Sequence, residues 1–204
     1  MAARPEPTCV GAEAASNGYE GVATEFMTRR GRGEIGLETV RAWSRGLTPG
    51  ASILDLGCGH GLPISQALLD DGFELHGIDA APTLVAAFRR RCPDARVICE
   101  AVEHSSFFGR SFDGVVAVGL MFLLAEAVQL AVIDRVASAL RPGGRFLFSA
   151  PAQACSWTDV LTERSSQSLG ASAYHARMIA AGLTPMRSWV DGGENHYFAA
   201  ERVP

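Results

Sequence analysis

Three glycines at alternating positions, Gly57, Gly59 and Gly61, follow a short apolar run and precede a helical pattern. Because glycine has no Cβ atom, the backbone there can turn sharply and let a bulky ligand lie against the strand end and the helix start. Asp79 ends the next apolar run, 22 residues after Gly57. A carboxylate there can accept hydrogen bonds from both hydroxyls of a ribose, so the pattern predicts an adenosine-type cofactor. A plainer interpretation leaves the glycines as a tight turn and Asp79 as a helix cap.

The spacing and charge of this turn discriminate between two cofactors. A dinucleotide fingerprint has the pattern GxGxxG, whose third glycine would fall at position 62, but this chain has Leu62 there. Asp55, two residues before Gly57, would also repel a pyrophosphate. The same carboxylate stabilises a positively charged ligand, and S-adenosylmethionine carries both a sulfonium and an ammonium group. The residues therefore favour S-adenosylmethionine over a nicotinamide dinucleotide.

Composition and charge narrow the class of protein. The chain has 204 residues, 48% of them hydrophobic, and a formal net charge of −4, so nothing electrostatic suggests nucleic acid or a membrane as a partner. Its five cysteines include no CxxC pair, and we expect no disulfide framework and no metal site. The most apolar segment, 115–124, is too short to span a bilayer, and we recognise no signal peptide. We expect a cytoplasmic protein.

Strands and helices alternate from residue 52 to residue 149. Short apolar runs bounded by glycine or polar residues predict strands, and amphipathic stretches between them predict helices. Such alternation favours a parallel sheet with helices on both faces. The predicted strands are 52–57, 73–79, 95–99, 112–118 and 145–149, and the predicted helices are 62–71, 82–92 and 125–140.

Both ends of the chain depart from this alternation. We expect a flexible leader over 1–16 and then two helices, 19–30 and 34–45, which form a lid within 17–48 and turn Ile35 inward. The stretch 150–170 has no clear element. After a helix near 171–181, the runs 185–190 and 195–201 flank only four residues, which requires an antiparallel hairpin. The predicted fold is a single α/β domain over 17–204, with a doubly wound, mostly parallel seven-stranded sheet and a C-terminal antiparallel hairpin.

Four segments occur in an order that is typical of one family. They are Ile53–Gly61, His76–Asp79, Ser111–Val116 and Leu140–Phe146. Together they resemble the class I S-adenosylmethionine-dependent methyltransferases of the small-molecule type, and the resemblance extends from about Tyr19 to the C-terminus. It implies a Rossmann-like fold, S-adenosylmethionine as cofactor and a small molecule as methyl acceptor.

The resemblance also implies roles for individual residues. Those expected to contact the methionine part of the cofactor are Gly57, Cys58 and Gly59, with Asp55 supporting its amino group. Asp79 is expected to bind the ribose. The adenine is expected beside Ala80, Glu100 and Ala101, although the family more often has aspartate where this chain has Glu100. The residues expected between cofactor and substrate are Val118 and Leu120.

The acceptor is less defined than the cofactor. Methyl transfer is an in-line displacement at an activated carbon, which needs alignment and exclusion of water more than a fixed catalytic residue. We therefore leave the catalytic residues open. Candidates for substrate contact are Tyr19, His104, Trp157 and His196, with His175 as a further histidine of interest.

Two other functions stay open at this level, besides the identity of the acceptor and the oligomeric state. One is a nicotinamide-dependent oxidoreductase, which shares the strand, glycine turn and helix. The other is a non-catalytic domain that retains the cofactor fold.

Overall fold

A computed structural model describes residues 9–30 and 33–203. The main sheet contains eight strands, in the order β3-β2-β1-β4-β5-β10-β8, with β9 also paired to β10. Their bounds are β1 Ser52–Leu56, β2 Glu74–Asp79, β3 Arg96–Cys99, β4 Phe112–Ala117, β5 Leu140–Ser149, β8 Leu183–Pro185, β9 Trp189–Val190 and β10 His196–Arg202. Strands β1 to β5 are parallel, and β10 is antiparallel to β5. Because β8 and β9 share one edge of β10, the sheet has the seven positions that the sequence predicts, and the expected fold class is confirmed.

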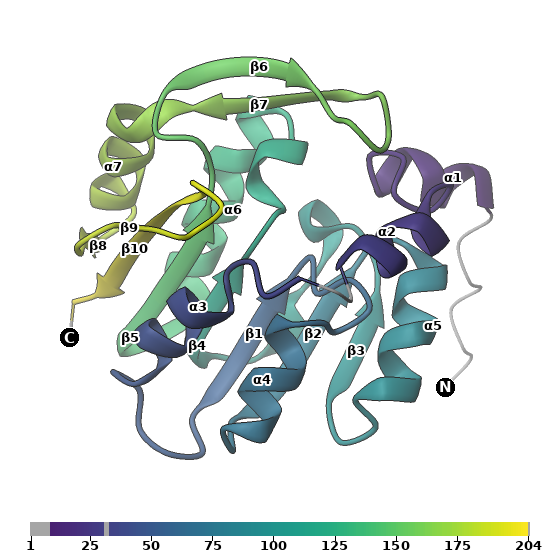
Figure 1. The fold of residues 1–204 in the computed structure, drawn as a ribbon. Helices are drawn as coiled ribbons and strands as arrows, with labels where there is room; N and C mark the ends of the chain where they lie inside the picture. Colours follow the sequence, from purple (N-terminus) through teal and green to yellow (C-terminus); the bar gives the residue numbers. More distant parts are fainter. Residues whose placement is uncertain (1–8, 31–32, 204) are drawn as a thin grey trace.

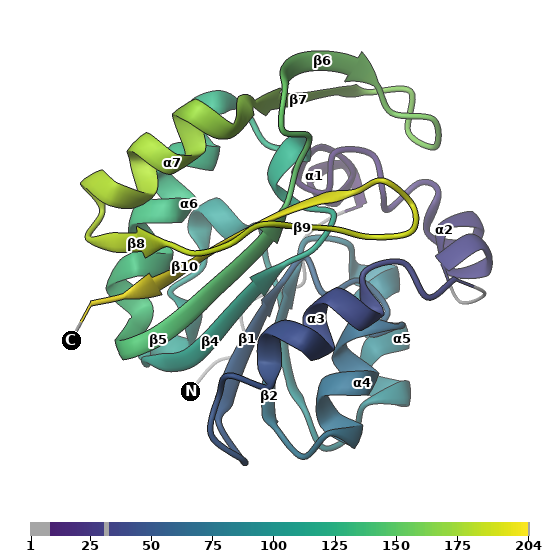
Figure 2. The ribbon, with the colours of Figure 1, turned by 60° about the vertical axis from the view of Figure 1, so that its left-hand side comes forward.

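Helices cover both faces of the sheet. Figures 1 and 2 show α3, α4 and α5 on one face, and α6 and α7 on the other. The helices are α1 Cys9–Ala15, α2 Ala23–Arg30, α3 Leu37–Ser44, α4 Ile64–Asp70, α5 Pro82–Arg91, α6 Glu126–Ala139 and α7 Gly170–Ala180, with short 3-10 turns η1 Val102–His104, η2 Phe107–Gly109 and η3 Met121–Leu123. Helices α1 and α2 lie near the upper edge of the sheet in Figure 1.

The buried strand residues alternate between two core clusters. Leu54 and Val115 pack toward α6 and α7, whereas Ile53 and Val116 pack toward the other face with Trp43 of α3. Successive side chains of a strand point to opposite faces, and both faces of this sheet are covered. This explains why the central strands are apolar almost throughout.

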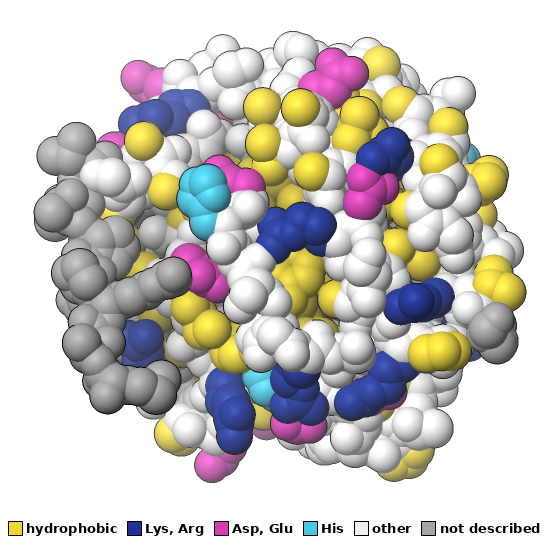
Figure 3. All heavy atoms as spheres, turned by 180° about the vertical axis from the view of Figure 1, so that it is seen from behind, with side chains coloured by type: hydrophobic (Ala, Val, Ile, Leu, Met, Phe, Trp, Pro, Cys, Tyr) yellow, Lys and Arg dark blue, Asp and Glu magenta, His cyan; other side chains and the backbone are white. Residues whose placement is uncertain are grey.

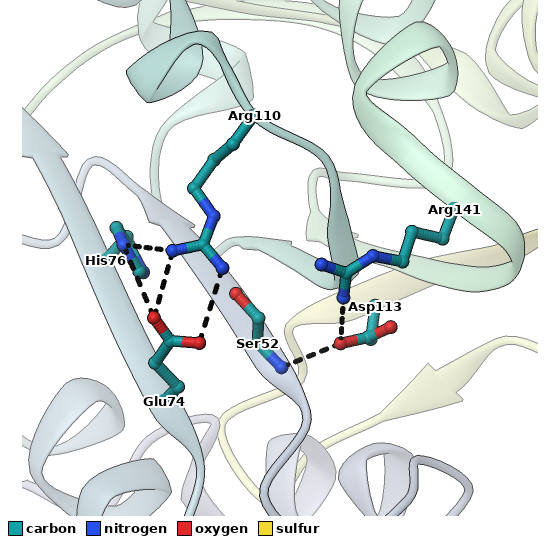
Figure 4. A network of polar contacts seen from close by, with 6 residues as sticks. All are labelled: Ser52, Glu74, His76, Arg110, Asp113 and Arg141. Atoms are coloured by element: carbon teal, nitrogen blue, oxygen red, sulfur yellow. Dashed lines mark hydrogen bonds and ion pairs between the residues drawn. The ribbon is translucent and has the colours of Figure 1, made fainter.

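A polar network fixes the amino ends of three neighbouring strands (Figure 4). Arg141 Nη1 donates to Asp113 Oδ2 at 2.5 Å, and the same oxygen accepts the Ser52 backbone N–H at 2.8 Å. Arg110 donates to Glu74 at 2.9 Å and to the buried His76 Nε2 at 3.1 Å. Burial lowers the pKa of His76, which suits an imidazole that accepts from arginine. The network lies at the opposite strand ends from the glycine turn, so it anchors the sheet without entering the site.

Three expectations differ from the structure. The stretch 150–170 is not free of elements: it forms strands β6 (Ala154–Thr158) and β7 (Ser165–Leu169), a separate antiparallel pair. Residues 9–15 form α1, with Ala12 buried, where a flexible leader was predicted; residues 1–8 of that leader lie outside the described residues. Ile35 is 48% exposed because α3 begins only at Leu37 and does not turn it inward.

The surface gives little indication of a partner. No helix within 9–30 and 33–203 combines the length and apolar character that a membrane span needs. On the face opposite to the view of Figure 1, positive and negative side chains are interspersed (Figure 3). The expectation that no nucleic acid is bound stays a prediction.

Candidate functional site

A cavity of about 400 Å³ lies at the carboxyl ends of the parallel strands. Its floor comes from the turn after β1, the end of β2 and the segments that follow β3 and β4. Its other walls come from residues 14–19, from α2 and from the start of β10. Ligands of doubly wound sheets bind at this edge, where helices leave the sheet in opposite directions.

The glycine turn holds the backbone against this cavity. Gly57 and Gly59 line it, with φ angles of +71° and +56° that favour glycine. A Cβ atom on Gly57 would lie 3.1 Å from Leu120 Cβ, and one on Gly59 would lie 3.3 Å from the ring of Phe26. Larger residues would therefore strain the turn and narrow the space beside it.

Asp79 is fixed by the turn that it faces. Its Oδ2 atom accepts the Gly59 backbone N–H at 2.8 Å, and Oδ1 accepts that of Ala81 at 2.9 Å. A carboxylate can accept about four hydrogen bonds, so each oxygen keeps capacity for a ligand hydroxyl. Burial raises the pKa of Asp79 to about 6, and the backbone hydrogen bonds lower it in part. Near neutral pH the group is an oriented acceptor pair.

Glu100 supplies a second acceptor on the same side. It follows β3 and lines the cavity with Ala80, and its backbone N–H bonds to the Asp79 carbonyl at 3.0 Å. Its Oε1 atom is buried and has no hydrogen-bond partner among the residues that the structure describes. A buried acceptor without a partner is costly, and a ligand amino group could satisfy it. The residues present therefore fit a nucleoside with hydroxyl and amino donors.

Asp55 acts from beneath the cavity. It is 3% exposed, does not line the cavity, and accepts a hydrogen bond from Ser65 Oγ at 2.6 Å. Burial raises its pKa to about 7, Ser65 opposes this shift, and the charge of Asp79 adds to it. A cation placed above it would favour its ionised form.

Arg30 is a cavity residue that the sequence interpretation missed. It ends α2 and is the only lysine or arginine among the described residues that line the cavity. Burial lowers its pKa, whereas the charges of Asp55 and Asp191 favour the cation. No sequence motif indicates that Arg30 and the glycine turn lie at the same cavity.

Comparison with known proteins agrees with this geometry. Residues 53–144 match the model of a family described as a methyltransferase domain. Over this segment the chain is thus similar to a methyltransferase domain. It is 36% identical over 114 residues to a carboxy-S-adenosyl-L-methionine synthase from Chromohalobacter salexigens, over 52% of this chain and 42% of that protein. It is 33% identical over 106 residues to a ubiquinone biosynthesis O-methyltransferase from Xanthomonas campestris, over 50% of this chain and 43% of that protein.

A solved structure confirms the fold predicted for this chain. This chain superposes with a TM-score of 0.71 on the 1,6-didemethyltoxoflavin-N1-methyltransferase of Burkholderia thailandensis. That enzyme was crystallised with 1,6-didemethyltoxoflavin and S-adenosylhomocysteine. The alignment covers 98% of this chain and 94% of that one at 19% identity. The resemblance to S-adenosylmethionine-dependent methyltransferases is thus confirmed, while the chain spans less than half the length of the two sequence relatives above.

Most of the cofactor residues predicted from the sequence line the cavity. Those that do are Gly57, Gly59, Asp79, Ala80, Glu100, Val118 and Leu120. Asp55, Cys58 and Ala101 are buried behind it. Burial raises the pKa of the Cys58 thiol, whose sulfur lies where a Cβ on Gly77 would meet it at 2.8 Å, so it fills space in the core.

The predicted substrate candidates divide differently. Tyr19 lines the cavity, whereas His104, Trp157 and His196 do not. His104 is exposed on η1. Trp157 contacts the cavity only through Phe122, with ring centroids 5.4 Å apart.

His196 does not line the cavity because it lies on the opposite face of β10. Its ring lies 4.5 Å from that of Phe198, while its neighbours Asn195 and Tyr197 line the cavity. Successive strand residues face opposite sides, so the alternation could have identified Tyr197. His175 also lies against Phe198, with ring centroids 5.6 Å apart.

Proposed function

We propose that this protein transfers a methyl group from S-adenosylmethionine to a small-molecule acceptor. The observation that carries the proposal is the convergence of Asp79, Glu100 and the glycine turn on one cavity. Asp79 can accept hydrogen bonds from hydroxyl groups, Glu100 has an unsatisfied carboxylate oxygen, and the backbone of the glycine turn lies close to the cavity. Together these features suit an adenosine. The family match over 53–144 supports the same reading.

Different residues would bind different parts of the cofactor. Asp79 would accept the ribose hydroxyls, and Glu100 would accept the adenine amino group. Arg30 would hold the carboxylate of the methionine part, and the negative charge of Asp55 would favour its ammonium. When bound, S-adenosylmethionine supplies a methyl group on a positively charged sulfur. The protein then has to align the acceptor with that methyl group and exclude water.

The lid expected from the sequence is part of this proposal. Tyr19, Phe26, Arg30 and Ile35 line the cavity from within residues 17–48. The structure adds the hairpin β6–β7, which lies across the top of the molecule in Figure 1. We include both segments in the cover of the site. The cytoplasmic location and the small-molecule partner expected from the sequence stay predictions.

Calorimetric titration of the purified protein tests the proposal. We expect binding of S-adenosylmethionine and S-adenosylhomocysteine and no binding of NADH. Binding of NADH alone would favour the nicotinamide-dependent alternative, and binding of none of the three at millimolar concentration would reject the proposed site.

A second measurement tests the reaction rather than the site. One of the relatives is named a carboxy-S-adenosyl-L-methionine synthase, so cofactor binding alone does not identify methyl transfer. The products of S-adenosylmethionine with a broad acceptor panel should include S-adenosylhomocysteine and a methylated acceptor in equal amounts. Tight binding without any transfer would favour a non-catalytic domain, and a modified cofactor would favour different chemistry.

A further inference from the structure

Aromatic rings gather on several walls of the cavity. Among the described residues, four aromatic side chains line it: Tyr19, Phe26, Phe122 and Tyr197. They come from the N-terminal segment, from the turn after β4 and from β10, which are far apart in the sequence. None of these rings belongs to the glycine turn or to the ends of β2 and β3.

One aromatic wall is built on η3. Phe122 lines the cavity, and Trp157 of β6 packs behind it at a tilt of 48°. The Gln129 side-chain amide donates to the Leu124 carbonyl at 2.9 Å and to the Gln167 carbonyl at 3.1 Å, which joins η3 to β7. Trp157 therefore supports the Phe122 ring, and Gln129 anchors the turn that carries it.

The second aromatic wall is built on the N-terminal segment. Tyr19 and Phe26 form an edge-to-face pair, with centroids 5.2 Å apart and planes at 88°. This is a favoured geometry for aromatic pairs, so each ring fixes the other. Both rings line the same cavity as Phe122.

The tyrosine hydroxyls of these walls are already engaged. Tyr19 donates to Asp159 Oδ2 at 3.2 Å, and Tyr197 donates to Asp191 Oδ2 at 2.8 Å. Burial and these carboxylates raise the pKa of both tyrosines, so the phenols stay protonated. What the two side chains can present to a ligand is therefore mainly ring surface.

We propose that the methyl acceptor is a planar aromatic molecule, held against Phe122 and the Tyr19–Phe26 pair. This inference rests on the proposed function, because it concerns the acceptor of the same reaction. A nucleophilic atom on the aromatic acceptor forms a bond to the methyl carbon as the carbon–sulfur bond breaks, and that bonding pair stays on sulfur. A proton held by the acceptor atom leaves to solvent.

Two probes of one skeleton test this inference. Protein saturated with S-adenosylhomocysteine is titrated with 2-naphthol and with decahydro-2-naphthol, which carries a hydroxyl at the same position but has no aromatic ring. Aromatic contacts should make 2-naphthol bind about tenfold tighter. Equal binding, tighter binding of the saturated probe, or no binding of either would overturn the inference.

Variants test whether the preference for 2-naphthol arises from the proposed aromatic wall. Phe122→Leu and Trp157→Leu keep apolar volume but remove a ring, and each should reduce the preference for 2-naphthol several-fold. Trp189→Leu is the matched control, because Trp189 lies on β9 and does not line the cavity. An unchanged preference in both wall variants would overturn the assignment. Failure of S-adenosylhomocysteine itself to bind is a separate result, since it would reject the proposed function.

Discussion

Tyr19 and Asp159 are 140 residues apart in the chain, yet the tyrosine hydroxyl donates a hydrogen bond to the aspartate at 3.2 Å. Asp159 is in turn fixed by the backbone N–H groups of Leu161 and Thr162, both at 2.9 Å from Oδ1. A second contact, between Arg164 and Glu13 at 3.2 Å, joins the same two segments. These contacts join the N-terminal segment to the tip of β6–β7, which supports the proposal that the two segments cover the cavity together.

Removing the Tyr19 hydroxyl should loosen this cover without removing its ring. We expect Tyr19→Phe to release S-adenosylhomocysteine about tenfold faster or more, because a hydrogen bond to a charged group contributes about 1.5–3 kcal/mol and about 1.4 kcal/mol is a factor of ten. Stopped-flow displacement measures the rate. Ser44→Ala is the control: Ser44 is buried on α3, away from the cover, and the variant loses a hydrogen bond to the Arg41 carbonyl, so it should lower the melting temperature and leave the release rate unchanged. Equal release rates for Tyr19→Phe and wild type would contradict a role of this contact in the cover.

A disulfide between the N-terminal segment and the tip of β6–β7 should keep the proposed cover closed. A Cβ atom on Gly18 would lie 2.9 Å from Thr162 Cβ, so a small shift brings this pair into the range of a disulfide, about 3.5–4.5 Å. In a background with Cys9 and Cys155 replaced by serine, oxidised Gly18→Cys/Thr162→Cys protein should exchange bound S-adenosylhomocysteine at least about tenfold more slowly. Reduction should restore the exchange. If oxidation leaves the rate unchanged, ligand enters by another route.

The sequence predicted the sheet well and the cover poorly. The central strands are buried on both faces, through residues such as Leu54 on one and Ile53 on the other, so their apolar runs identified the strands, and glycines with positive φ marked the turn. Strand β6 escaped detection because it is largely exposed, and β7 escaped because its buried positions, Ser166 and Ser168, are polar. Arg30 escaped because its role depends on where α2 lies, which no local pattern encodes.

Asp79 should be the residue on which cofactor affinity depends most. Asp79→Asn keeps one acceptor oxygen and the shape of the side chain but removes the charge that two ribose hydroxyls would share. We expect the affinity for S-adenosylhomocysteine to fall about tenfold or more. Calorimetry measures it, with a thermal melt to show that the variant is folded. Unchanged affinity in a folded variant would mean that the ribose lies elsewhere.

Arg30 should act only on ligands that carry a carboxylate. Arg30→Gln is expected to weaken binding of S-adenosylhomocysteine about tenfold and to leave 5′-methylthioadenosine, which lacks the amino acid part, within about twofold of wild type. The exposed Arg29→Gln is the neighbouring control. An equal loss for both ligands would show that Arg30 supports the cavity rather than the carboxylate.

Asp55 should make the stability of the protein depend on pH. Its pKa of about 7 exceeds the value near 3.9 of an unfolded aspartate, so the folded state retains the proton longer. The stability this group contributes is therefore complete below about pH 4 and is lost as the pH rises through about 7, by up to about 1.4 kcal/mol per pH unit.

The comparison with Asp55→Asn isolates this effect. His60, whose pKa burial lowers to about 4, and Asp191, whose pKa backbone hydrogen bonds help to lower, change stability in the opposite direction. Both groups are present in both proteins, so they cancel in the difference. Thermal melts from about pH 5 to about pH 8 should show the variant gaining stability relative to wild type as the pH rises. Saturating S-adenosylmethionine should shift this gain to lower pH, because a cation above Asp55 favours its ionised form. A difference that is constant with pH would mean that Asp55 is ionised throughout.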